Sequence, residues 1–471
     1  MKNVSLPEYW DEETEVIVIG SGFAGLAAAI EAKNAGNSVI ILEKMKGYGG
    51  NSVISDGVVA VPGTAFQENA GIKDTPQLML EDMLEAGLNL NHSELVGTLV
   101  KHAADTFQWT IDYLGVTYRD QVLRLGGHSI PRSHITGKNS GSEIIKKQIQ
   151  KVKSLGIRIR TRVCLENILK DSDERVCGVA VREGYQFPDQ SSGVRKFIKA
   201  TKGVVLATGG FASDVEFRSI HDSRLTDNVD STNKYSTTAE ALKEALRIGA
   251  MPIHLSWIQL GPWTSPDEKF YGIAPEFADY IVFQFGIMVD PQTGKRIVNE
   301  LDDRKVMSDA ILNTGHPCIG IADARGVEVS GYRVDHCLRK GIAKAFSQIS
   351  DIAEHYEIPS RELMESIESY NSYVDEKLDP IFGKPILDNA EPLSNPPYYC
   401  IRLWPKVHHT MGGVLINGEA QVLNLSKQPI KGFYAAGEVT GGVHGASRLG
   451  SCAIVDCLVF GRIAGKNAAK S

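Results

Sequence analysis

The fold of this chain is decided by Val16–Glu43, which begins VIVIGSGFAG and continues LAAAIEAKNAGNSVIILE. Val16–Ile19 is a short apolar run typical of a buried strand. An alanine-rich helical pattern covers 26–35, and a second apolar strand pattern covers 38–42. The order strand, helix, strand predicts a β-α-β unit.

Three glycines and one acid give this unit a predicted ligand. Gly20, Gly22 and Gly25 lie between the first strand and the helix. There they allow a tight turn, the close approach of a pyrophosphate and close helix–strand packing. Glu43 ends the second strand, where a carboxylate accepts hydrogen bonds from ribose hydroxyls and disfavours a 2′-phosphate. The stretch therefore predicts a dinucleotide-binding unit.

Composition excludes several classes of function. The chain has 471 residues and a formal net charge of -7, and its basic residues are scattered, so we expect no nucleic-acid partner. Residues 1–14 carry no secretory signal and no apolar run is long enough for a transmembrane segment, which predicts a cytoplasmic protein. None of the seven cysteines forms a Cys-x-x-Cys motif, so we expect no metal, haem or iron–sulfur cluster.

A second group of motifs lies near the C-terminus, at 408–413 (HHTMGG), 435–438 (AAGE) and 445–450 (GASRLG). They bring two histidines, one carboxylate and one arginine together among glycines. A structural core rarely needs this combination. With the N-terminal unit it predicts a small anion held against a dinucleotide, and hence a flavoenzyme.

The rest of the chain divides into a nucleotide-binding part and an insert. We expect a glycine-rich loop at 49–52, either an approach to the flavin ring or an ordinary surface loop. The other expected elements are a mainly helical stretch at 84–156, strands at 157–163, 176–182 and 203–210, a strand at 432–436 and a helix at 453–469. The predicted domains are an FAD-binding domain at 1–250 and 405–471 and an inserted capping domain at 251–404. The predicted fold class is α/β, a discontinuous Rossmann-like domain with an α+β insert.

Together these motifs resemble the flavoprotein subunits of the fumarate reductase and succinate dehydrogenase family, in particular its soluble flavocytochrome c-like branch of FAD-dependent enoate reductases. The resemblance covers essentially the whole chain. It implies FAD bound in the nucleotide-binding domain, a capping domain that closes over it, and an active site between the two.

The resemblance also implies roles for single residues. His408 and Arg448 match the residues that bind the substrate carboxylate, and His409 and Glu438 match residues at the flavin. Arg304, at the end of the segment 294–304, matches the proton donor. From the residues alone Arg304 is interpreted as an ion-pair partner of Asp302 or Asp303. The alternative for the two histidines is a core or capping role, and the alternative for Arg448 is a phosphate contact to FAD.

The predicted site is larger than these motifs. The predicted substrate-binding residues are His408, Arg448, Ser451, Asp279 and Tyr280, and the predicted catalytic residue is Arg304. The predicted FAD contacts are Gly20, Gly22, Phe23, Ala24, Gly25, Glu43, Lys44, Gly50, Asn51, Ser52, Gly57, Val163, Thr208, Gly209, His409, Glu438, Ala453 and Ile454.

The insert departs from the fumarate-specific pattern. Gly261 stands where those members have a histidine for the second carboxylate, and Asp279-Tyr280 replaces a Thr-Glu pair. This predicts a mono-carboxylate enoate, and five nearby aromatic residues suggest an aryl or heteroaryl acrylate that stacks on them. The alternative is that they build the core of the insert; the five are Trp257, Trp263, Tyr280, Phe283 and Phe285. The loop at 49–54 has no histidine for covalent attachment, so FAD is expected to be non-covalent.

The sequence leaves several functions open. The preferred reaction is reduction of the C=C bond of an α,β-unsaturated carboxylate, with hydride from flavin N5 and electrons from a separate donor, either a protein or a reduced flavin or nicotinamide. Fumarate reductase or succinate dehydrogenase activity is one alternative. A ketosteroid dehydrogenase and an electron-transfer or sensor subunit without turnover are the others.

Overall fold

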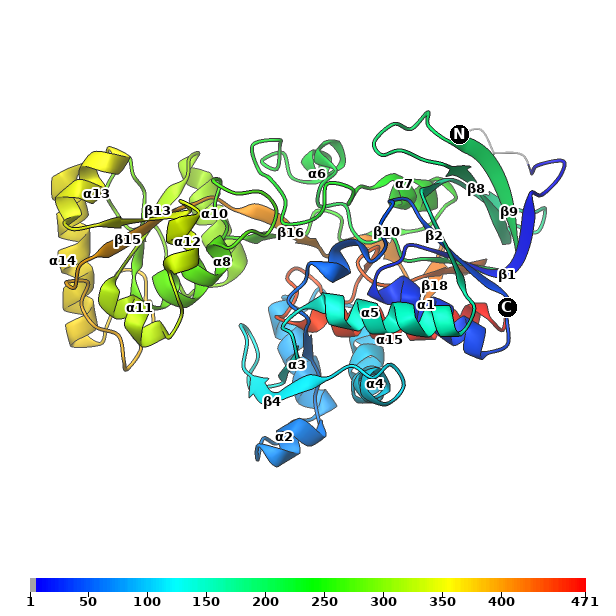
Figure 1. Cartoon of the computed structure of the whole chain (residues 1–471), viewed down its shortest axis with the longest axis horizontal. Coiled ribbons are helices and arrows are strands. Elements are labelled where there is room, and N and C mark those ends of the chain that lie inside the picture. The colour runs from blue at the N-terminus through cyan, green and yellow to red at the C-terminus, as the bar shows by residue number, and fades with distance from the viewer. Residues whose placement is uncertain (1–5) are drawn as a thin grey trace. The chain divides into compact units, whose positions relative to one another are not determined.

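The chain folds into two compact units in a computed structural model that describes residues 6–471 (Figure 1). The first unit comprises the described part of Met1–His221, with Lys234–Ile258 and His409–Ser471. The second unit comprises Asp222–Asn233 and Gln259–His408. The assignment of 1–250 with 405–471 to FAD binding and of 251–404 to capping stays a prediction about what the parts do.

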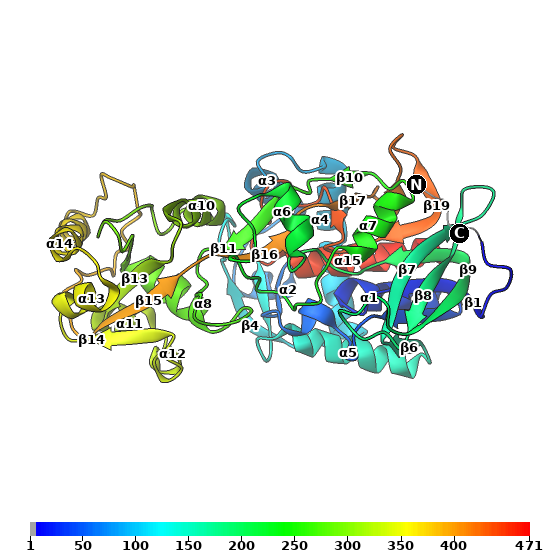
Figure 2. The same cartoon turned by 90° about the horizontal axis from the view of Figure 1, so that it is seen from above.

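An eight-stranded sheet forms the centre of the first unit, with the order β18-β19-β9-β1-β2-β6, and β8 and β7 continue from β9. Figure 2 shows β7, β8, β9 and β1 side by side. β1 pairs in parallel with β2 and β9, and β9 pairs in parallel with β19. The strands are β1 Glu12–Ile19, β2 Val39–Glu43, β6 Arg158–Thr161, β7 Val163–Lys170, β8 Val176–Glu183, β9 Val194–Leu206, β18 Gln421–Leu423 and β19 Pro429–Ala435. The predicted parallel nucleotide-binding sheet is confirmed.

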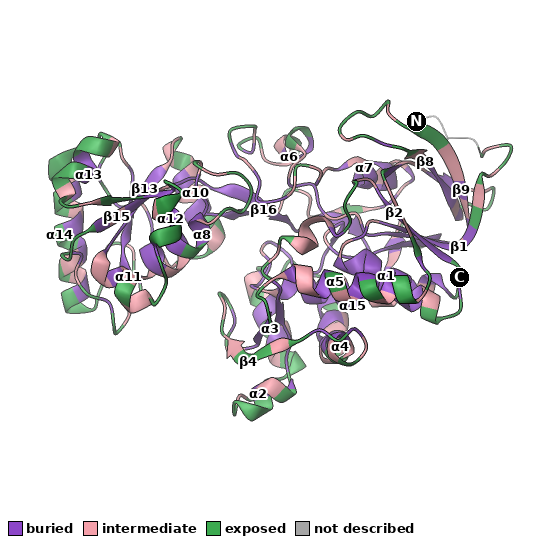
Figure 3. Ribbon diagram, in the orientation of Figure 1, coloured by how far each residue is buried: buried purple, intermediate pink, exposed green. Residues whose placement is uncertain are grey.

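Three helices pack beside this sheet: α1 Phe23–Asn34, α5 Gly141–Ser154 and α15 Cys452–Ala468 (Figure 1). α1 is buried along most of its length, which its alanines permit because they allow close packing. A Cβ on Gly461 would lie 2.5 Å from the Ala24 carbonyl oxygen, and one on Gly465 would lie 2.1 Å from that of Ala28. These two glycines therefore let α15 lie directly against α1, so that the chain's two ends share one core (Figure 3).

The stretch predicted as mainly helical is only partly so. It contains α3 Pro76–Ala86, α4 Ser93–Asp112 and α5, but also β4 Tyr118–Leu123 and β5 Ser133–Thr136. They form a three-stranded sheet with β3 Val58–Ala60, in the order β3-β5-β4, and α2 Ala65–Asn69 follows β3 in the chain. The helical expectation was wrong there because short strands of mixed polarity give no strong periodic signal.

The remaining elements of the first unit are short. The predicted loop at 49–52 is a 3₁₀ turn, η1 Gly50–Val53. β10, β17 and β20 form a small sheet, and α6 and α7 lie between β9 and β10 in sequence. Their bounds are α6 Val215–His221, α7 Glu240–Arg247, β10 Pro252–Ile253, β17 Gly413–Leu415 and β20 Thr440–Gly441. β11 Ile258–Gly261 pairs with β16 Lys406–Thr410, and the unit boundary falls within both strands.

The second unit has an antiparallel sheet of order β12-β13-β15-β14. Its core joins this sheet to α13 and α14 and includes Ile321, Leu363 and Tyr370. The strands are β12 Ile287–Val289, β13 Cys318–Asp323, β14 Ala343–Phe346 and β15 Tyr398–Leu403. The helices are α8 Ala274–Phe277, η2 Ala278–Val282, α9 Phe283–Phe285, α10 Arg304–Thr314, α11 Ala324–Ser330, α12 Asp335–Arg339, α13 Ile349–Tyr356 and α14 Ser360–Glu376. This unit is α+β, as the sequence predicts.

Across residues 6–471, none of the helices combines the length and the apolar character needed to cross a membrane.

Candidate active site

The turn between β1 and α1 is shaped for a ligand that approaches backbone. Gly20 has φ +103°, and a Cβ there would lie 2.2 Å from the Ala207 carbonyl oxygen. A Cβ on Gly25 would lie 2.0 Å from the Gly20 carbonyl oxygen. Both positions therefore require glycine. The first is needed for the close contact with the end of β9, and the second for the close contact between turn and helix.

Glu43 closes the other side of this turn. Its Oε2 accepts hydrogen bonds from the Ser21 hydroxyl at 2.5 Å and the Ser21 amide at 3.3 Å, and its Oε1 accepts from the Met45 amide at 2.9 Å. The carboxylate, only 8% exposed, is thus fixed at the end of β2. Turn, helix N-terminus and acid together fit a dinucleotide pyrophosphate and its ribose.

The other predicted FAD contacts lie in the first unit, around these strands. Ser52 accepts a hydrogen bond from the Phe23 amide at 3.1 Å, and Asn51 accepts one from the Lys234 amide at 2.9 Å. Lys44 instead pairs with Glu240 at 3.1 Å, so it has a protein partner. The others are placed as follows: Gly22 and Ala24 at the turn, Gly50 in η1, Gly57 before β3, Val163 at the start of β7, Thr208 and Gly209 after β9, and Ala453 and Ile454 in the first turn of α15.

The C-terminal motifs build a buried polar group in the first unit. Glu438 Oε1 accepts hydrogen bonds from the Thr410 amide at 3.0 Å and hydroxyl at 3.1 Å, and its Oε2 lies 3.6 Å from His409 Nδ1. Burial raises the pKa of Glu438, against the hydrogen bonds from Thr410 and the charge of Arg448. The His409 ring also makes an edge contact with His444, at 5.7 Å between centroids. His409 is therefore anchored by an acid and a second histidine.

Arg448 and Ser451 lie in the loop before α15. Arg448 is 8% exposed and donates from Nη1 to the Leu449 carbonyl oxygen at 3.2 Å. Ser451 has φ +59° at the start of α15, and its carbonyl oxygen accepts from the Ala60 amide at 3.0 Å. The loop thus places a buried guanidinium just before a helix N-terminus, an arrangement suited to an anion.

His408 belongs to the second unit, although its neighbour His409 belongs to the first. Successive side chains of a strand point to opposite sides, and both residues lie in β16. The Thr232 hydroxyl lies 2.9 Å from His408 Nδ1 and orients the ring. The Trp263 ring makes an edge contact with it, at 5.1 Å between centroids. The motif therefore supplies one histidine to each unit.

Arg304 lies beside the same tryptophan. Its guanidinium carbon is 5.8 Å from the centroid of the Trp263 ring, a cation–π distance. Among the described residues no ion pair joins Arg304 to Asp302 or Asp303, so the alternative that the sequence left open is not supported. Asp303 instead caps α10, accepting from the Lys305 amide at 2.7 Å. His408, Trp263 and Arg304 thus form one cluster in the second unit, which we call the tryptophan cluster.

The predicted substrate-binding residues Asp279 and Tyr280 lie in η2. Burial raises the pKa of Asp279, and the charge of Arg304 only partly opposes this effect. Asp279 is therefore a weaker anion than its sequence suggests. The Tyr280 ring stacks on Tyr332, with centroids 4.3 Å apart.

The five aromatic residues predicted to cluster have different surroundings in the structure. Phe283 and Phe285 are 2% and 7% exposed, and Phe285 belongs to the core with β12, β13 and α14. Trp257 is part of the first unit. Trp263 contacts Gly261, where a Cβ would lie 2.7 Å from the indole ring. The core alternative is confirmed for Phe285, and Trp263 remains as the aromatic residue at His408.

Sequence reasoning missed Thr232, Tyr271 and Thr410. Thr410 lies within the motif at 408–413, and this position is the signal that could have identified it. Its contact with Glu438 joins two separate motifs and cannot be inferred from their spacing. Thr232 and Tyr271 lie outside every motif, and Tyr271 lies 6.2 Å from His408 between ring centroids. Only the fold brings these residues to the histidine.

Comparison with known proteins identifies the family. Residues 15–454 match the family model described as an FAD binding domain. The chain is 40% identical to the acrylate reductase flavoprotein subunit of Shewanella woodyi, over 97% of this chain and 91% of that protein. It is 33% identical to the urocanate reductase of Eggerthella lenta, over 98% and 75%. The solved open conformation of a flavocytochrome c3 fumarate reductase is similar with a TM-score of 0.83 and 34% identity, covering 98% of this chain and 79% of that one.

These similarities extend over nearly the whole chain and include the glycine turn, the buried acid and the C-terminal loop described above. The cofactor that the glycine turn fits is FAD. The chain belongs to the FAD-binding family of fumarate reductase flavoproteins, and it is an FAD-dependent oxidoreductase that reduces the C=C bond of an α,β-unsaturated carboxylate.

Proposed function

We propose that the substrate is a 2-enoate with a single carboxylate and no charged group attached to its β-carbon. Acrylate is the simplest such compound. The observation that supports this proposal is the contact between Gly261 and Trp263. A Cβ at Gly261 would lie 2.7 Å from the indole, so a histidine for a second carboxylate does not fit without moving the tryptophan. The 40% identity to an acrylate reductase subunit supports the same substrate.

In this proposal Arg448 and His408 bind the carboxylate. A guanidinium matches the two carboxylate oxygens with two parallel hydrogen bonds, and it stabilises the negative charge that develops as the double bond is reduced. Bound FAD, in its reduced form, supplies the hydride that goes to the β-carbon. Arg304 gives a proton to the α-carbon and regains one from solvent, so that the π bond is replaced by two C–H bonds.

Two observations favour different sizes for the group attached to the β-carbon of the substrate. Trp263 is only 4% exposed, so its ring offers little surface for stacking and favours a short tail. Tyr271 is 38% exposed and lies near His408, which favours an aryl or heteroaryl acrylate; the 33% identity to a urocanate reductase supports this second candidate.

We further propose that FAD is bound non-covalently and is reduced by a separate donor, either a protein or a reduced flavin or nicotinamide. The loop 49–54 offers no histidine for attachment, and no Cys-x-x-Cys-His haem motif is present in the sequence. Acid precipitation checks the first point: we expect the yellow flavin in the supernatant, and flavin in the pellet would contradict it.

The substrate is tested by anaerobic reoxidation of the dithionite-reduced enzyme. The panel contains acrylate, crotonate, cinnamate, 4-hydroxycinnamate, urocanate, fumarate and a ketosteroid. We expect fast reoxidation by acrylate and slow reoxidation by fumarate, because Gly261 offers no side chain to bind the second carboxylate. Reoxidation by fumarate alone would establish the fumarate reductase alternative. Reoxidation by the ketosteroid alone would contradict the proposed carboxylate-binding role of Arg448 and His408, because a ketosteroid has no carboxylate.

Arg448→Lys tests the carboxylate contact within the same assay. Lysine keeps the charge but loses the paired hydrogen bonds, so we expect reoxidation by acrylate to slow at least about tenfold with flavin content unchanged. Arg462→Lys is the control, since Arg462 pairs with Glu31 at 2.6 Å and should not affect the reaction. Equal rates for wild type and Arg448→Lys would contradict the proposed role.

A further inference from the structure

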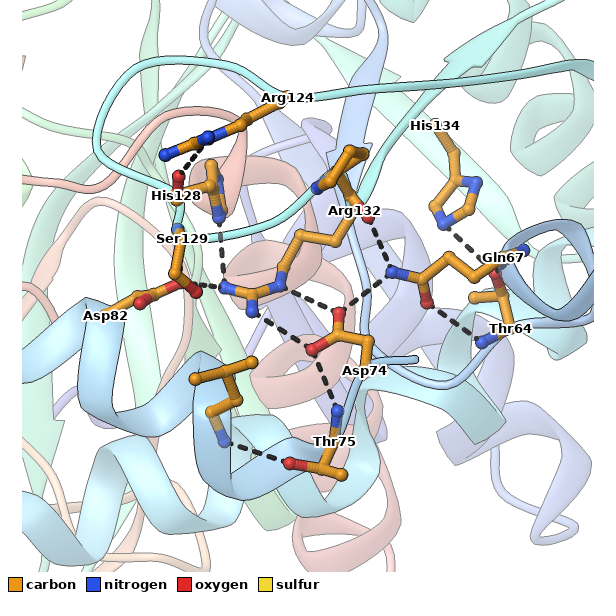
Figure 4. A network of polar contacts seen from close by, with 12 residues as sticks. Thr64, Gln67, Asp74, Thr75, Asp82, Arg124, His128, Ser129, Arg132 and His134 are labelled. Carbon is orange, nitrogen blue, oxygen red and sulfur yellow. Dashed lines mark hydrogen bonds and ion pairs between the residues drawn. The ribbon is translucent and has the colours of Figure 1, made fainter. Parts of the chain in front are cut away.

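Figure 4 shows a buried ionic network centred on Arg132. Arg132 is 0% exposed and donates to Asp74 from Nε at 2.8 Å and from Nη2 at 3.0 Å. It also donates from Nη1 to Asp82, which in turn accepts from the Ser129 amide at 2.9 Å and hydroxyl at 2.8 Å. Each buried charge therefore has charged or hydrogen-bonding partners.

The network stays ionised despite its burial. Burial alone would lower the pKa of Arg132, but the hydrogen bonds and charges of Asp74 and Asp82 raise it overall. Burial alone would raise the pKa of Asp82, but hydrogen bonds from Ser129 and Arg132 lower it overall. Arg132 is thus a permanently charged donor of fixed position.

This fixed donor determines which nitrogen of His128 carries the proton. Arg132 Nη1 lies 3.2 Å from His128 Nδ1, and a guanidinium only donates, so Nδ1 accepts. Burial lowers the pKa of His128, which keeps the ring neutral with its proton on Nε2. Nε2 lies 2.7 Å from the Gly450 carbonyl oxygen and therefore donates to it.

Gly450 lies two residues after Arg448, in a segment with no regular structure of its own. Other contacts hold the earlier part of this loop. Asn91 Nδ2 donates to the Val443 carbonyl oxygen at 2.8 Å, and the Ala446 amide donates to the Gly87 carbonyl oxygen at 3.0 Å. The hydrogen bond from His128 reaches this loop two residues after Arg448. The path from Asp82 and Arg132 through His128 thus ends at the backbone beside the arginine.

We propose that His128, oriented by Arg132, is a positioning residue that holds the Arg448 loop in the conformation that binds the substrate carboxylate. This inference rests on the proposed function of Arg448. Without this hydrogen bond the Gly450 carbonyl oxygen loses its partner His128, so the backbone beside Arg448 is held less firmly and the guanidinium shifts from the position that binds the carboxylate. Substrate affinity is then lowered, while the flavin contacts made elsewhere in the first unit are kept.

Binding of acrylate to the oxidised holoenzyme, followed by the change in flavin absorbance, tests this role. His128→Phe removes both hydrogen bonds, and His128→Asn keeps an acceptor for Arg132 but is too short to reach Gly450. For both we expect the Kd to rise about tenfold, equivalent to about 1.4 kcal/mol, with a larger effect on KM than on kcat. His128→Gln can accept from Arg132 and donate to Gly450, so it should bind within about threefold of wild type.

Two further variants separate this inference from the proposed function. His134→Gln is the matched control, because His134 is equally buried but contacts Thr64 at 3.3 Å rather than the loop. If Arg448→Lys weakens binding but His128→Phe and His128→Asn do not, the positioning role is wrong and the proposed function stands. If Arg448→Lys binds acrylate like wild type, both the proposed role of Arg448 and the positioning role of His128 are wrong. Equal losses in His128→Gln and His128→Phe would also contradict the inference, and if His128→Phe does not fold, His128→Asn gives the answer.

Discussion

At the scale of single residues, the surroundings of Arg304 bear on its proposed role as proton donor. It begins α10, its guanidinium faces the Trp263 ring, and the described residues offer it no carboxylate ion pair. An arginine is an unusual acid because its pKa exceeds about 12. Arg132, by contrast, is held by two carboxylates, those of Asp74 and Asp82.

We predict that Arg304→Lys lowers the rate of flavin reoxidation by acrylate at least about 100-fold, the usual size of a general-acid contribution. The Kd for acrylate should change little, because in the proposed function Arg448 and His408, not Arg304, bind the carboxylate. Single-turnover stopped-flow measurements give the rate, and Arg333→Lys, an exposed arginine paired with Asp335, is the control. A rate within about threefold of wild type would exclude Arg304 as the proton donor.

His134 provides a residue-scale prediction about pH. Burial lowers the pKa of His134 to about 4. In the unfolded chain the ring titrates near 6.5, so below that pH the unfolded state binds a proton that the folded state does not. The stability from neutral His134 is therefore fully present above pH 6.5 and is lost as the pH falls toward 4.

We expect this one group to remove roughly 2 to 3 kcal/mol of unfolding free energy between pH 6.5 and 4.5. His134→Gln should flatten that part of the pH profile, measured by urea denaturation of the holoenzyme. The exposed His336 gives the matched variant, His336→Gln, which should leave the profile as it is. Parallel wild-type and His134→Gln profiles would show that His134 does not titrate in this way.

At the scale of elements, the β1–α1 turn allows a test of why glycine is needed. Gly20 and Gly36 both have positive φ, at +103° and +90°. A Cβ at Gly20 would lie 2.2 Å from the Ala207 carbonyl oxygen, whereas nothing lies within 4 Å of a Cβ at Gly36. The two positions share backbone strain and differ in the contact.

We predict that Gly20→Ala loses most of its FAD, because the end of β9 must move away from the turn that is predicted to bind the pyrophosphate. Gly36→Ala should keep its FAD and lose only about 1 to 2 kcal/mol of stability from the left-handed conformation. The ratio of flavin to protein absorbance in the purified variants measures this. Equal flavin content in the two would mean that strain alone, and not the contact with Ala207, makes Gly20 necessary.

Some elements of this structure can be predicted from local sequence patterns, and others cannot. The unit from β1 to β2 follows from local patterns, since apolar runs, alanines and glycine spacing all agree there. β9 begins at Val194, nine residues before the expected start at Gly203, because its first half pairs with β8 and carries polar residues. For the site, the spacing identified His408 and His409 but not their separate partners. Thr232 and Trp263 reach His408 through contacts between distant parts of the chain, which no local pattern contains.

At the scale of the whole molecule, the two units have separate cores and separate buried charge networks. In the second unit Arg296 lies 2.7 Å from Glu300 and 2.9 Å from Asp379, and Lys384 lies 3.4 Å from Glu300. Their side chains are at most 5% exposed. Glu300 also accepts from the Met288 amide at 2.9 Å, which attaches the network to β12. Two cations and two carboxylates balance, so the loss of one cation leaves a buried negative charge.

We therefore predict that Arg296→Met destabilises the second unit by about 3 to 5 kcal/mol, the usual result of breaking a buried ion pair. Because the cores are separate, amide hydrogens of β12, β13 and β15 should exchange faster while those of β1 and β19 keep the wild-type rates. FAD content should also be unchanged, since every predicted FAD contact lies in the first unit. Lys305→Met is the matched control: its ion pair with Asp309 is exposed, and such pairs contribute at most about 1 kcal/mol. If exchange accelerates equally in both units, the chain unfolds as a single cooperative structure, and the division into two independently stable cores is wrong.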